Sequence, residues 1–107
     1  MDLRLKKQSD FDFVFKKGKK CYGKSMLMVY VKSRDTKIGF SVSKKNGGAV
    51  VRNRIKRYFR AAFNEYKNCL NGDYHIVLVP KKSETYSYFA FKEDILFLLK
   101  KERLIDG

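Results

Sequence analysis

The residues best suited to chemistry in this sequence lie in the run 44–60, which contains seven basic side chains and no acidic one. A glycine pair, Gly47-Gly48, lies near its start, and the residues from Arg52 onward have helical spacing. Five Lys or Arg residues fall between Arg52 and Arg60, and four of them are arginines, whose planar guanidinium groups bind a phosphate through two hydrogen bonds at once. The chemistry that this run offers is therefore the binding of a phosphate backbone.

The helical phase of this run separates its cations from an apolar stripe. At about 100° per residue, one sector of the helix collects the apolar and aromatic side chains Ile55, Phe59, Ala62, Phe63 and Tyr66. Broadly opposite lie Asn53, Lys56, Arg57, Arg60, Asn64 and Lys67, with Arg52 and Arg54 on the flanks. Like charges three or four residues apart repel each other, so a helix that needed only to be soluble would carry acids among them. We therefore favour an anion-binding face over an ordinary solvated one.

The rest of the sequence predicts neither a catalytic nor a metal site. His75 is a single histidine in a predicted strand, where a structural role suits it better than catalysis. Asp10 and Asp12 are better placed to cap a helix than to bind a metal ion. The glycine pair is too short for a nucleotide phosphate loop, and neither a Ser-His-Asp set nor paired carboxylates are visible.

The composition indicates one domain over residues 1–107, with 44% apolar and 15% aromatic residues available for its core. The net charge is +14, and the whole excess lies in residues 1–60, which contain 18 Lys/Arg and 4 Asp/Glu. Such a concentration of positive charge favours a nucleic acid as the partner. A membrane is less favoured, because no stretch approaches the roughly 20 apolar residues of a spanning helix. With no apolar signal region visible, we expect a cytoplasmic protein in which Cys21 and Cys69 are reduced thiols.

The hydrophobic pattern predicts the elements that position the basic helix. Residues 9–12 have the form of a capping box at the start of a short helix over 10–17, and a basic turn over 16–20 leads out of this helix. β-Branched and aromatic residues predict strands, the first two joined as an antiparallel hairpin. The predicted strands are 25–32, 37–43 and 74–79, and the later helices run from 49 or 52 to 67 and from 88 to about 103. The order α-β-β-α-β-α is that of an α+β protein with a small sheet covered by helices.

At this point the sequence resembles a known family. Residues 42–60 read VSKKNGGAVVRNRIKRYFR, which is similar to the signature of the bacterial ribonuclease P protein subunit. The resemblance covers most of the chain, because residues 4–18 and 37–43 are similar to the family's N-terminal segment and second strand. Its most specific part is the Arg-Asn-Arg helix with the Ser-Lys-Lys upstream of it.

The resemblance implies a basic protein cofactor of ribonuclease P, a ribonucleoprotein endonuclease that removes the 5′ leader from precursor tRNA. Catalysis and Mg²⁺ then belong to the RNA subunit, and no catalytic or metal-binding residue is expected in this chain. In the family the Arg-Asn-Arg helix packs against the catalytic RNA, a role that transfers to Arg52, Asn53, Arg54, Lys56, Arg57 and Arg60. The family fold is a split βαβ with a small mixed sheet and a left-handed crossover, although the general rule favours right-handed ones.

The resemblance further implies a cleft between the sheet and the first helix that binds the single-stranded leader. Aromatic side chains there stack on bases, and cations follow the backbone. The matching residues are Phe11, Phe15, Tyr30, Lys44, Lys45 and Lys81. Taken alone, Phe11 and Phe15 are equally explained as core residues, whereas the resemblance favours a partly exposed stacking role. Gly48 in place of the family's usual Asn, and Pro80-Lys81 in place of a common Arg-Lys pair, depart from its pattern.

Two alternative functions stay open on the sequence. A general RNA-binding or ribosomal protein of the same build would use the basic helix without a role in tRNA processing. A self-sufficient nuclease is disfavoured by the lack of acids over 44–60, because metal-assisted nucleases need carboxylate ligands. We expect the partners to be the catalytic RNA and the precursor tRNA leader, without DNA or membrane partners, and the protein to be a monomer in the holoenzyme.

Overall fold

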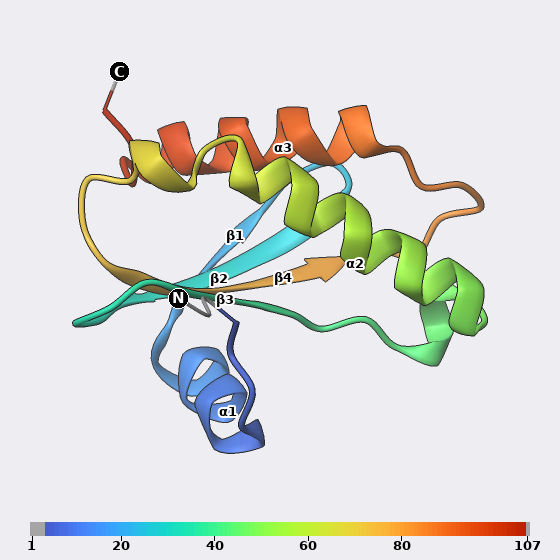
Figure 1. Ribbon diagram of the computed structural model, residues 1–107, viewed down its shortest axis with the longest axis horizontal. Helices are drawn as coiled ribbons and strands as arrows, with labels where there is room; N and C mark the ends of the chain where they lie inside the picture. The colour runs from blue at the N-terminus through green and yellow to red at the C-terminus, as the bar shows by residue number, and fades with distance from the viewer. Residues whose placement is uncertain (1–3, 107) are drawn as a thin grey trace.

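Four strands form one mixed sheet in the computed structural model, which describes residues 4–106 (Figure 1). The strands are β1 (Lys19–Tyr22), β2 (Met26–Lys32), β3 (Lys37–Phe40) and β4 (Tyr74–Pro80). Their order is β1-β2-β4-β3; β3 and β4 are parallel, and the other neighbouring pairs are antiparallel. The helices are α1 (Gln8–Lys17), α2 (Ala49–Asn64) and α3 (Tyr88–Lys101), with two short 3₁₀ helices, η1 (Lys44–Asn46) and η2 (Lys67–Cys69). This is the α+β architecture that the sequence predicts.

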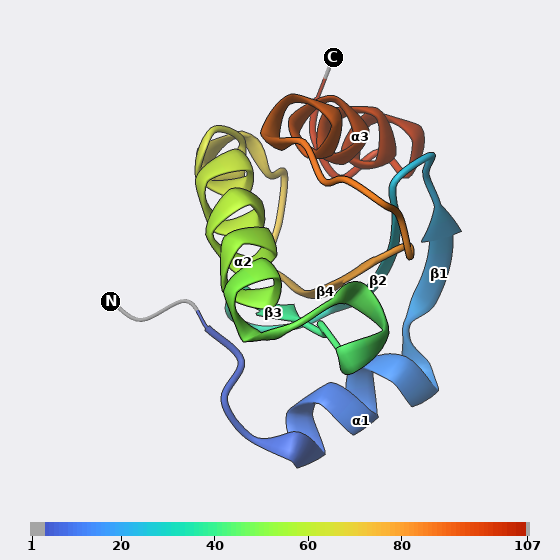
Figure 2. The same ribbon diagram turned by 90° about the vertical axis from the view of Figure 1, so that its right-hand side faces the viewer.

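The sheet carries helices on both faces because its strands are apolar on both sides. In β2, Met26 and Met28 point to the face covered by α2 and α3. Leu27, Val29 and Val31 point to the opposite face. Figure 2 shows α1 covering that face. Successive side chains of a strand alternate between faces, and β4 follows the same alternation. The strands therefore supply two separate cores, one on the α2/α3 face and a smaller one on the α1 face.

Phe59 connects the elements of the larger core. It is fully buried in the middle of α2, with its ring 5.7 Å from that of Phe40 in β3 and 4.4 Å from that of Phe91 in α3. Full burial of such a side chain stabilises a fold by about 1.5–3 kcal/mol. Other members of the predicted stripe are buried with it: Ile55, Ala62 and Phe63. The opposite side of α2 is therefore directed to solvent.

The connection from β3 through α2 to β4 is left-handed. Figure 1 shows both strands running toward the right of the view and α2 returning above the sheet toward the left. Figure 2 looks onto the carboxyl ends of these strands, with β4 to the right of β3 and α2 above them. The chain thus comes forward in β3, returns overhead and enters β4 on its right, which is a left-handed turn. The structure agrees with the family fold and departs from the general rule.

The sequence pattern misses β1. Lys19 and Lys20, which read as part of a basic turn, begin a strand that pairs antiparallel with β2. Of its residues only Cys21 is buried. Short edge strands that carry lysines resist pairing with other chains, and such a strand lacks the apolar alternation on which the prediction depends.

The capping box predicted at the start of the first helix is wrong. α1 begins at Gln8, and its N-cap Lys7 makes no side-chain cap. Asp12 instead accepts a hydrogen bond from the Gln8 side-chain amide at 3.0 Å. α1 ends at Lys17 and Gly18 follows it, as the sequence predicts. A Cβ at Gly18 would lie 2.4 Å from the Val14 carbonyl oxygen, so only glycine fits there.

Two further boundaries differ from the predicted ones. β3 ends at Phe40 rather than at residue 43, because Ser43 forms a capping box with Asn46 and opens η1. α2 ends at Asn64, residues 65 and 66 of the predicted helix form a turn, and its last residue, Lys67, begins η2. Both differences arise where local hydrogen bonds replace the regular backbone pattern.

Polar side chains fasten the β2–β3 hairpin to the start of β4. His75 Nε2 lies 2.8 Å from Asp35 Oδ1 and 3.3 Å from Ser33 Oγ, and Thr36 donates to Asp73 at 2.9 Å. The hydrogen bond with His75 lowers the pKa of Asp35. Because one ring nitrogen faces both partners, this cluster lacks the two-sided arrangement of a hydrolase triad. His75 has the structural role that the sequence predicts.

Candidate nucleic-acid interface

α2 presents its predicted cations on the side away from the core. The basic face of α2 consists of Arg52, Asn53, Arg54, Lys56, Arg57 and Arg60. Arg52 and Lys56 are half-buried, and the other four residues are exposed. Among the described residues, no carboxylate forms an ion pair with this face. Its positive field is directed outward, and a polyanion is the partner that it fits.

Aromatic contacts restrain two arginines of the basic face. The Arg60 guanidinium carbon lies 5.8 Å from the ring centre of Phe40, and that of Arg57 lies 5.9 Å from the ring centre of Tyr58. Such cation–π contacts contribute about 0.5–1 kcal/mol at exposed sites. Arg52 Nε is buried without a hydrogen-bond partner within residues 4–106 and keeps an unused donor.

A pocket of about 220 Å³ opens where α2 meets the outer edge of β3. Lys56 and Arg60 of the basic face line it together with Phe11 of α1. Arg4 also lines it, and the amide of the next residue, Leu5, donates to the edge of β3 at 2.9 Å. This β3-edge pocket brings two residues predicted for the catalytic RNA close to one predicted for the leader.

Phe11 reaches this pocket because β3 has a glycine facing α1. Ile38 and Phe40 point to the α2/α3 face, and Gly39 between them points to the α1 face. The ring of Phe11 takes the place of a side chain there and stays half-buried. Part of an aromatic ring is therefore open to the pocket.

Phe15 lies one helical turn after Phe11 on the same face. It is half-buried, and Leu27 and Val79 are half-buried in the same cluster. α1 thus covers only part of this face of the sheet. The aromatic surface of α1, formed by Phe11 and Phe15, keeps ring area on which a base can stack.

Tyr30 does not belong to this surface. It points to the opposite face of the sheet, where its ring meets Tyr74 edge-on at 6.0 Å and its hydroxyl donates to Glu102 at 2.9 Å. The residue of β2 that faces α1 at this level is Val29. A shift of one residue along a strand moves a side chain to the other face. The expectation that Tyr30 shares a surface with Phe11 and Phe15 is therefore wrong.

Glu102 joins Tyr30 to β1. Its carboxylate lies 2.8 Å from the Lys19 ammonium, and the side chain of Glu102 is 6% exposed. The hydrogen bond from Lys19 lowers the pKa of Glu102, and the bond from Tyr30 acts in the same direction against the effect of burial. Burial raises the pKa of Tyr30, and its bond to Glu102 adds to this. The cluster fastens the end of α3 to the sheet and has a structural role.

The predicted lysines of the leader site lie at one end of the sheet. β3 and β4 are parallel, so the segments that follow them leave the sheet together (Figure 1). Lys44 and Lys45 belong to η1, Lys81 follows β4 directly, and all three are exposed. Asn46 joins the two segments, because its side-chain amide donates to the Pro80 carbonyl at 3.5 Å. The structure thus brings these three lysines to one end, near the start of α2.

Sequence reasoning missed several residues of these surfaces. Arg4, Gly39 and Phe40 line the β3-edge pocket. One signal was available for Gly39, because a glycine inside an apolar strand often marks the close approach of another part of the chain. The position of Arg4 depends on the path of the N-terminal segment along β3, which no local pattern encodes.

The part of the chain that the structure describes contains no helix long and apolar enough to span a membrane. It also contains no group of three or more His, Cys, Asp or Glu side chains placed to hold a metal ion. Both cysteines are unpaired thiols, Cys21 buried and Cys69 exposed.

A helix with a basic face free of acids, beside a sheet whose other face carries half-buried aromatic rings, defines a nucleic-acid-binding protein of the α+β class. Known proteins make this assignment specific. The sequence model of the family Ribonuclease P matches residues 1–103. This chain belongs to the ribonuclease P protein family.

Relatives agree in sequence and in structure. The chain is 34% identical over 106 residues to the ribonuclease P protein component of Listeria innocua, with 95% of this chain and 89% of the relative covered. It is 37% identical over 105 residues to that of Finegoldia magna, with 92% and 89% covered. The RNase P protein of Staphylococcus aureus has a TM-score of 0.87 at 25% identity, covering 99% and 100% of the two chains. That of Thermotoga maritima has a TM-score of 0.80 at 30% identity, covering 97% and 98%.

Family membership confirms the predicted role as the protein subunit of ribonuclease P. The chain is a protein component of ribonuclease P, part of an endoribonuclease of tRNA processing, and its partner is the RNase P RNA. The alternative of a general RNA-binding protein without a role in tRNA processing is disfavoured.

Proposed function

We propose that this protein binds the catalytic RNA through the basic face of α2 and the 5′ leader of precursor tRNA through the aromatic surface of α1. The RNA carries out the endonucleolytic step, and the protein is a non-catalytic cofactor that works as a monomer in the cytoplasm. The observation that carries the proposal is the separation of two surfaces: cations cover α2 above one face of the sheet, and Phe11 and Phe15 lie half-buried on the other.

The basic face of α2 suits a folded RNA. Its arginines project from a helix whose opposite side is fixed in the core by Ile55 and Phe59, so the cations keep a constant spacing. Each phosphate that they neutralise releases counterions from the RNA, so binding should weaken steeply as salt rises. Asn53 adds an amide that can donate to and accept from RNA groups.

The aromatic surface of α1 suits a single strand. Stacking of a base on an aromatic ring contributes about 1–3 kcal/mol and tolerates any base. Lys44, Lys45 and Lys81 lie at one end of the sheet, where they supply charge for the backbone of the same strand. A leader that is unpaired therefore finds both kinds of contact.

Mg²⁺ is assigned to the RNA subunit. The ion takes oxygen ligands, chiefly carboxylates, phosphates and water. The side chains of the basic face and of the β3-edge pocket are cationic, aromatic or aliphatic apart from the Asn53 amide, and this donor set does not fit the ion. No step of the reaction is assigned to a metal ion on the protein.

Reconstitution with the catalytic RNA tests the proposal. The protein should tighten the binding of precursor tRNA to that RNA more than it tightens the binding of mature tRNA. Equal effects on both substrates would contradict the leader contact. Cleavage of precursor tRNA by the protein alone in Mg²⁺ would contradict its non-catalytic role.

Two variants separate the surfaces. Arg57→Ala should weaken binding to the catalytic RNA and make its salt dependence shallower by about one phosphate contact. Phe15→Ala should reduce the affinity for precursor tRNA and leave that for mature tRNA unchanged. If both variants affect both assays equally, the division between the two surfaces is wrong.

A further inference from the structure

A second cavity, of about 340 Å³, lies between the end of β4 and the start of α3. Three lysines line it, Lys24, Lys81 and Lys82, together with hydroxyl groups of serine, threonine and tyrosine side chains. No described carboxylate is among its lining residues. We infer that this β4–α3 pocket binds a phosphate group of an RNA strand.

The pairing of β2 with β4 brings these three lysines to one pocket. β2 and β4 pair along their whole length, and beyond them the Lys81 amide donates to the Ser25 carbonyl at 3.0 Å. Lys24 precedes Ser25 in the turn from β1 to β2, and Lys82 follows Lys81, so both line the pocket beside this hydrogen bond. Like charges that share a pocket repel each other, and among the described residues no carboxylate pairs with these three lysines. A phosphate between them would remove this repulsion.

α3 fixes the backbone that carries Lys24. The Asp94 carboxylate, in a residue 7% exposed, accepts from the Lys24 amide at 3.2 Å and from the Ser25 amide and hydroxyl at 2.5 and 2.6 Å. A Cβ at Gly23 would lie 2.8 Å from this carboxylate, so the turn closes tightly on it. The Asp94 carboxylate is thus hydrogen-bonded to the turn, and these bonds hold the backbone of Lys24 in place before any ligand binds.

Tyr86 fixes another side of the pocket. Its hydroxyl oxygen accepts from the Ser83 amide at 3.1 Å and from the side-chain amide of Asn46 at 3.2 Å. Asn46 is buried and anchored to Pro80. The hydroxyl proton of Tyr86 has no acceptor within residues 4–106, so this side chain keeps one donor that a phosphate oxygen can accept.

The start of α3 supplements the lysines. Ser87 is the N-cap and accepts from the Ala90 amide at 3.3 Å, and the first turn contains no acid. The N-terminus of an α-helix carries partial positive charge and favours anions. The field of the helix therefore adds to that of Lys24, Lys81 and Lys82.

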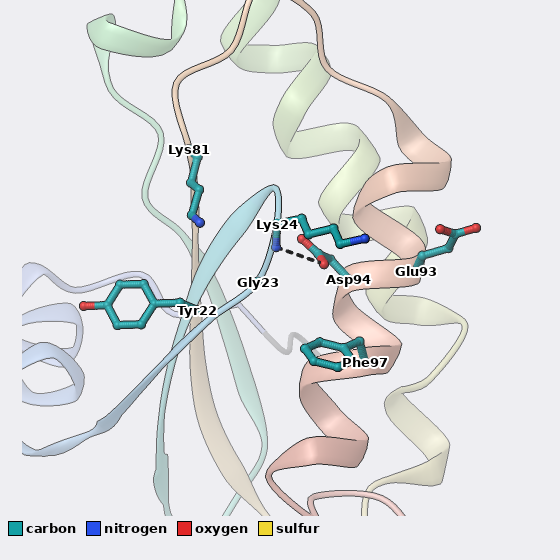
Figure 3. Close-up of a pocket in the computed structure, with 7 residues that line it drawn as sticks. All are labelled: Tyr22, Gly23, Lys24, Lys81, Glu93, Asp94 and Phe97. Carbon is teal, nitrogen blue, oxygen red and sulfur yellow. Dashed lines mark hydrogen bonds between the residues drawn. The ribbon is translucent and has the colours of Figure 1, made fainter.

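Acids lie in two adjoining cavities. Glu93 and Asp94 line one of about 670 Å³, which Lys24 and Lys81 also line (Figure 3). Glu84 lines another, together with Thr85 and Tyr86. Figure 3 shows Lys24 reaching across α3 on the side of Asp94 and Glu93, and Lys81 extending from the end of β4. Lys82 lines the β4–α3 pocket and not the cavity in Figure 3. It is the lysine whose replacement tests the phosphate pocket with the least effect elsewhere.

A nucleotide of an RNA strand fits the chemistry of the pocket. Lysine and hydroxyl donors bind phosphate oxygens, and the rings of Tyr86 and Phe91 offer apolar surface to the attached sugar or base. The pocket adjoins α3, apart from Phe11 and Phe15 on the α1 face. The pocket is thus a third contact with RNA. This inference rests on the proposed function in one respect, which is that the strand belongs to the catalytic RNA or to precursor tRNA.

Titration with inorganic phosphate, at an ionic strength held constant with chloride, tests the pocket itself. We expect saturable shifts of the backbone amide resonances of residues 81–87 in the wild-type protein. Lys82→Gln should abolish them and Lys82→Arg should keep them. Lys100→Gln, at the other end of α3, is the matched control and should bind like the wild type. Thermal unfolding shows that each variant is folded. Shifts that do not saturate, or that persist in Lys82→Gln, overturn the inference.

Binding of Lys82→Gln to RNA then identifies the strand. Loss of one phosphate contact should lower affinity by roughly tenfold and make the salt slope shallower by about one. A loss with the catalytic RNA alone assigns the phosphate to that RNA, and a loss confined to precursor tRNA assigns it to the leader. Unchanged affinity for both overturns the inference. If Lys82→Gln acts but Arg57→Ala and Phe15→Ala do not, the inference stands and the division of surfaces proposed above fails.

Discussion

The ring of Phe11 lies directly against Gly39: a Cβ at residue 39 would be 2.5 Å from the ring atom Cε1. The same Cβ would be 3.1 Å from a methyl carbon of Leu5. Glycine at this point of β3 is therefore what lets an aromatic ring of α1 reach the β3-edge pocket. A backbone position and a proposed binding residue depend on each other across the α1 face.

Gly39→Ala should displace the ring of Phe11 and weaken leader binding. Overpacking of this kind costs about 1–3 kcal/mol of stability, and misplacing one stacking ring costs a similar amount of binding. The affinity of the holoenzyme for precursor tRNA should fall, while that for mature tRNA stays the same. Gly48→Ala is the control, because no atom lies within 4 Å of a Cβ there. Unchanged precursor affinity in folded Gly39→Ala would show that the position of Phe11 is not important for binding.

Gly48→Asn should stabilise the protein by about 0.5–1 kcal/mol. Gly48 is the N-cap of α2 with φ −73° and ψ 179°, an extended conformation open to any residue, and it provides no side-chain cap. Asparagine would cap the helix and restrict the unfolded chain. Gly47→Ala should destabilise the protein, because Gly47 has φ 132° and its added Cβ would lie 3.1 Å from Val51. Urea unfolding measures both, and equal effects of the two variants would contradict this account of the turn.

Glu102→Gln should destabilise the protein at neutral pH and have less effect in acid. Folding lowers the pKa of Glu102, chiefly through the hydrogen bond from Lys19. A carboxyl group of this kind contributes stability that is fully present above its unfolded pKa and lost as pH falls through its folded pKa. The difference in unfolding free energy between wild type and variant should therefore shrink below the ordinary range of glutamate. A difference that is constant with pH would show that the charge of Glu102 has no part in it.

Thiol reagents should modify Cys69 and spare Cys21 in the folded protein. Cys69 is exposed, whereas Cys21 is 3% exposed and burial raises its pKa to about 11. The thiolate is the reactive form, so Cys21 is protected by both inaccessibility and protonation. Mass spectrometry after iodoacetamide should show one adduct on the native protein and two after unfolding. Cys69→Ser should show none while native, and an adduct on that variant would mean that the β1 edge opens.

The basic helix could be predicted because its own residues show which side is apolar and which side is cationic. Ile55 and Phe59 recur at helical spacing, and the cations between them are directed the other way. Which side enters the core can be decided within the helix itself. This is why the candidate residues of α2 lie where the sequence places them.

Tyr30 could not be placed from the sequence because β2 is apolar on both faces. Alternation divides its residues into two sets, one with Met28 and one with Val29. Which set meets α1 depends on the paths of α1 and α3, and tertiary packing, not the local sequence, decides these paths. The β4–α3 pocket was missed for a similar reason, because the pairing of β2 with β4 is what brings Lys24 and Lys82 to one pocket.

The hand of the β3–α2–β4 connection decides which side of the sheet α2 covers. A right-handed path between the same parallel strands would place α2 on the α1 face, where its cations would compete with Phe11 and Phe15 for one surface. The observed path places the two surfaces back to back, divided by one layer of sheet, with β3 at their common edge. Two RNA strands bound as proposed would lie on either side of this layer at once, and the protein would act as a spacer of fixed thickness between them.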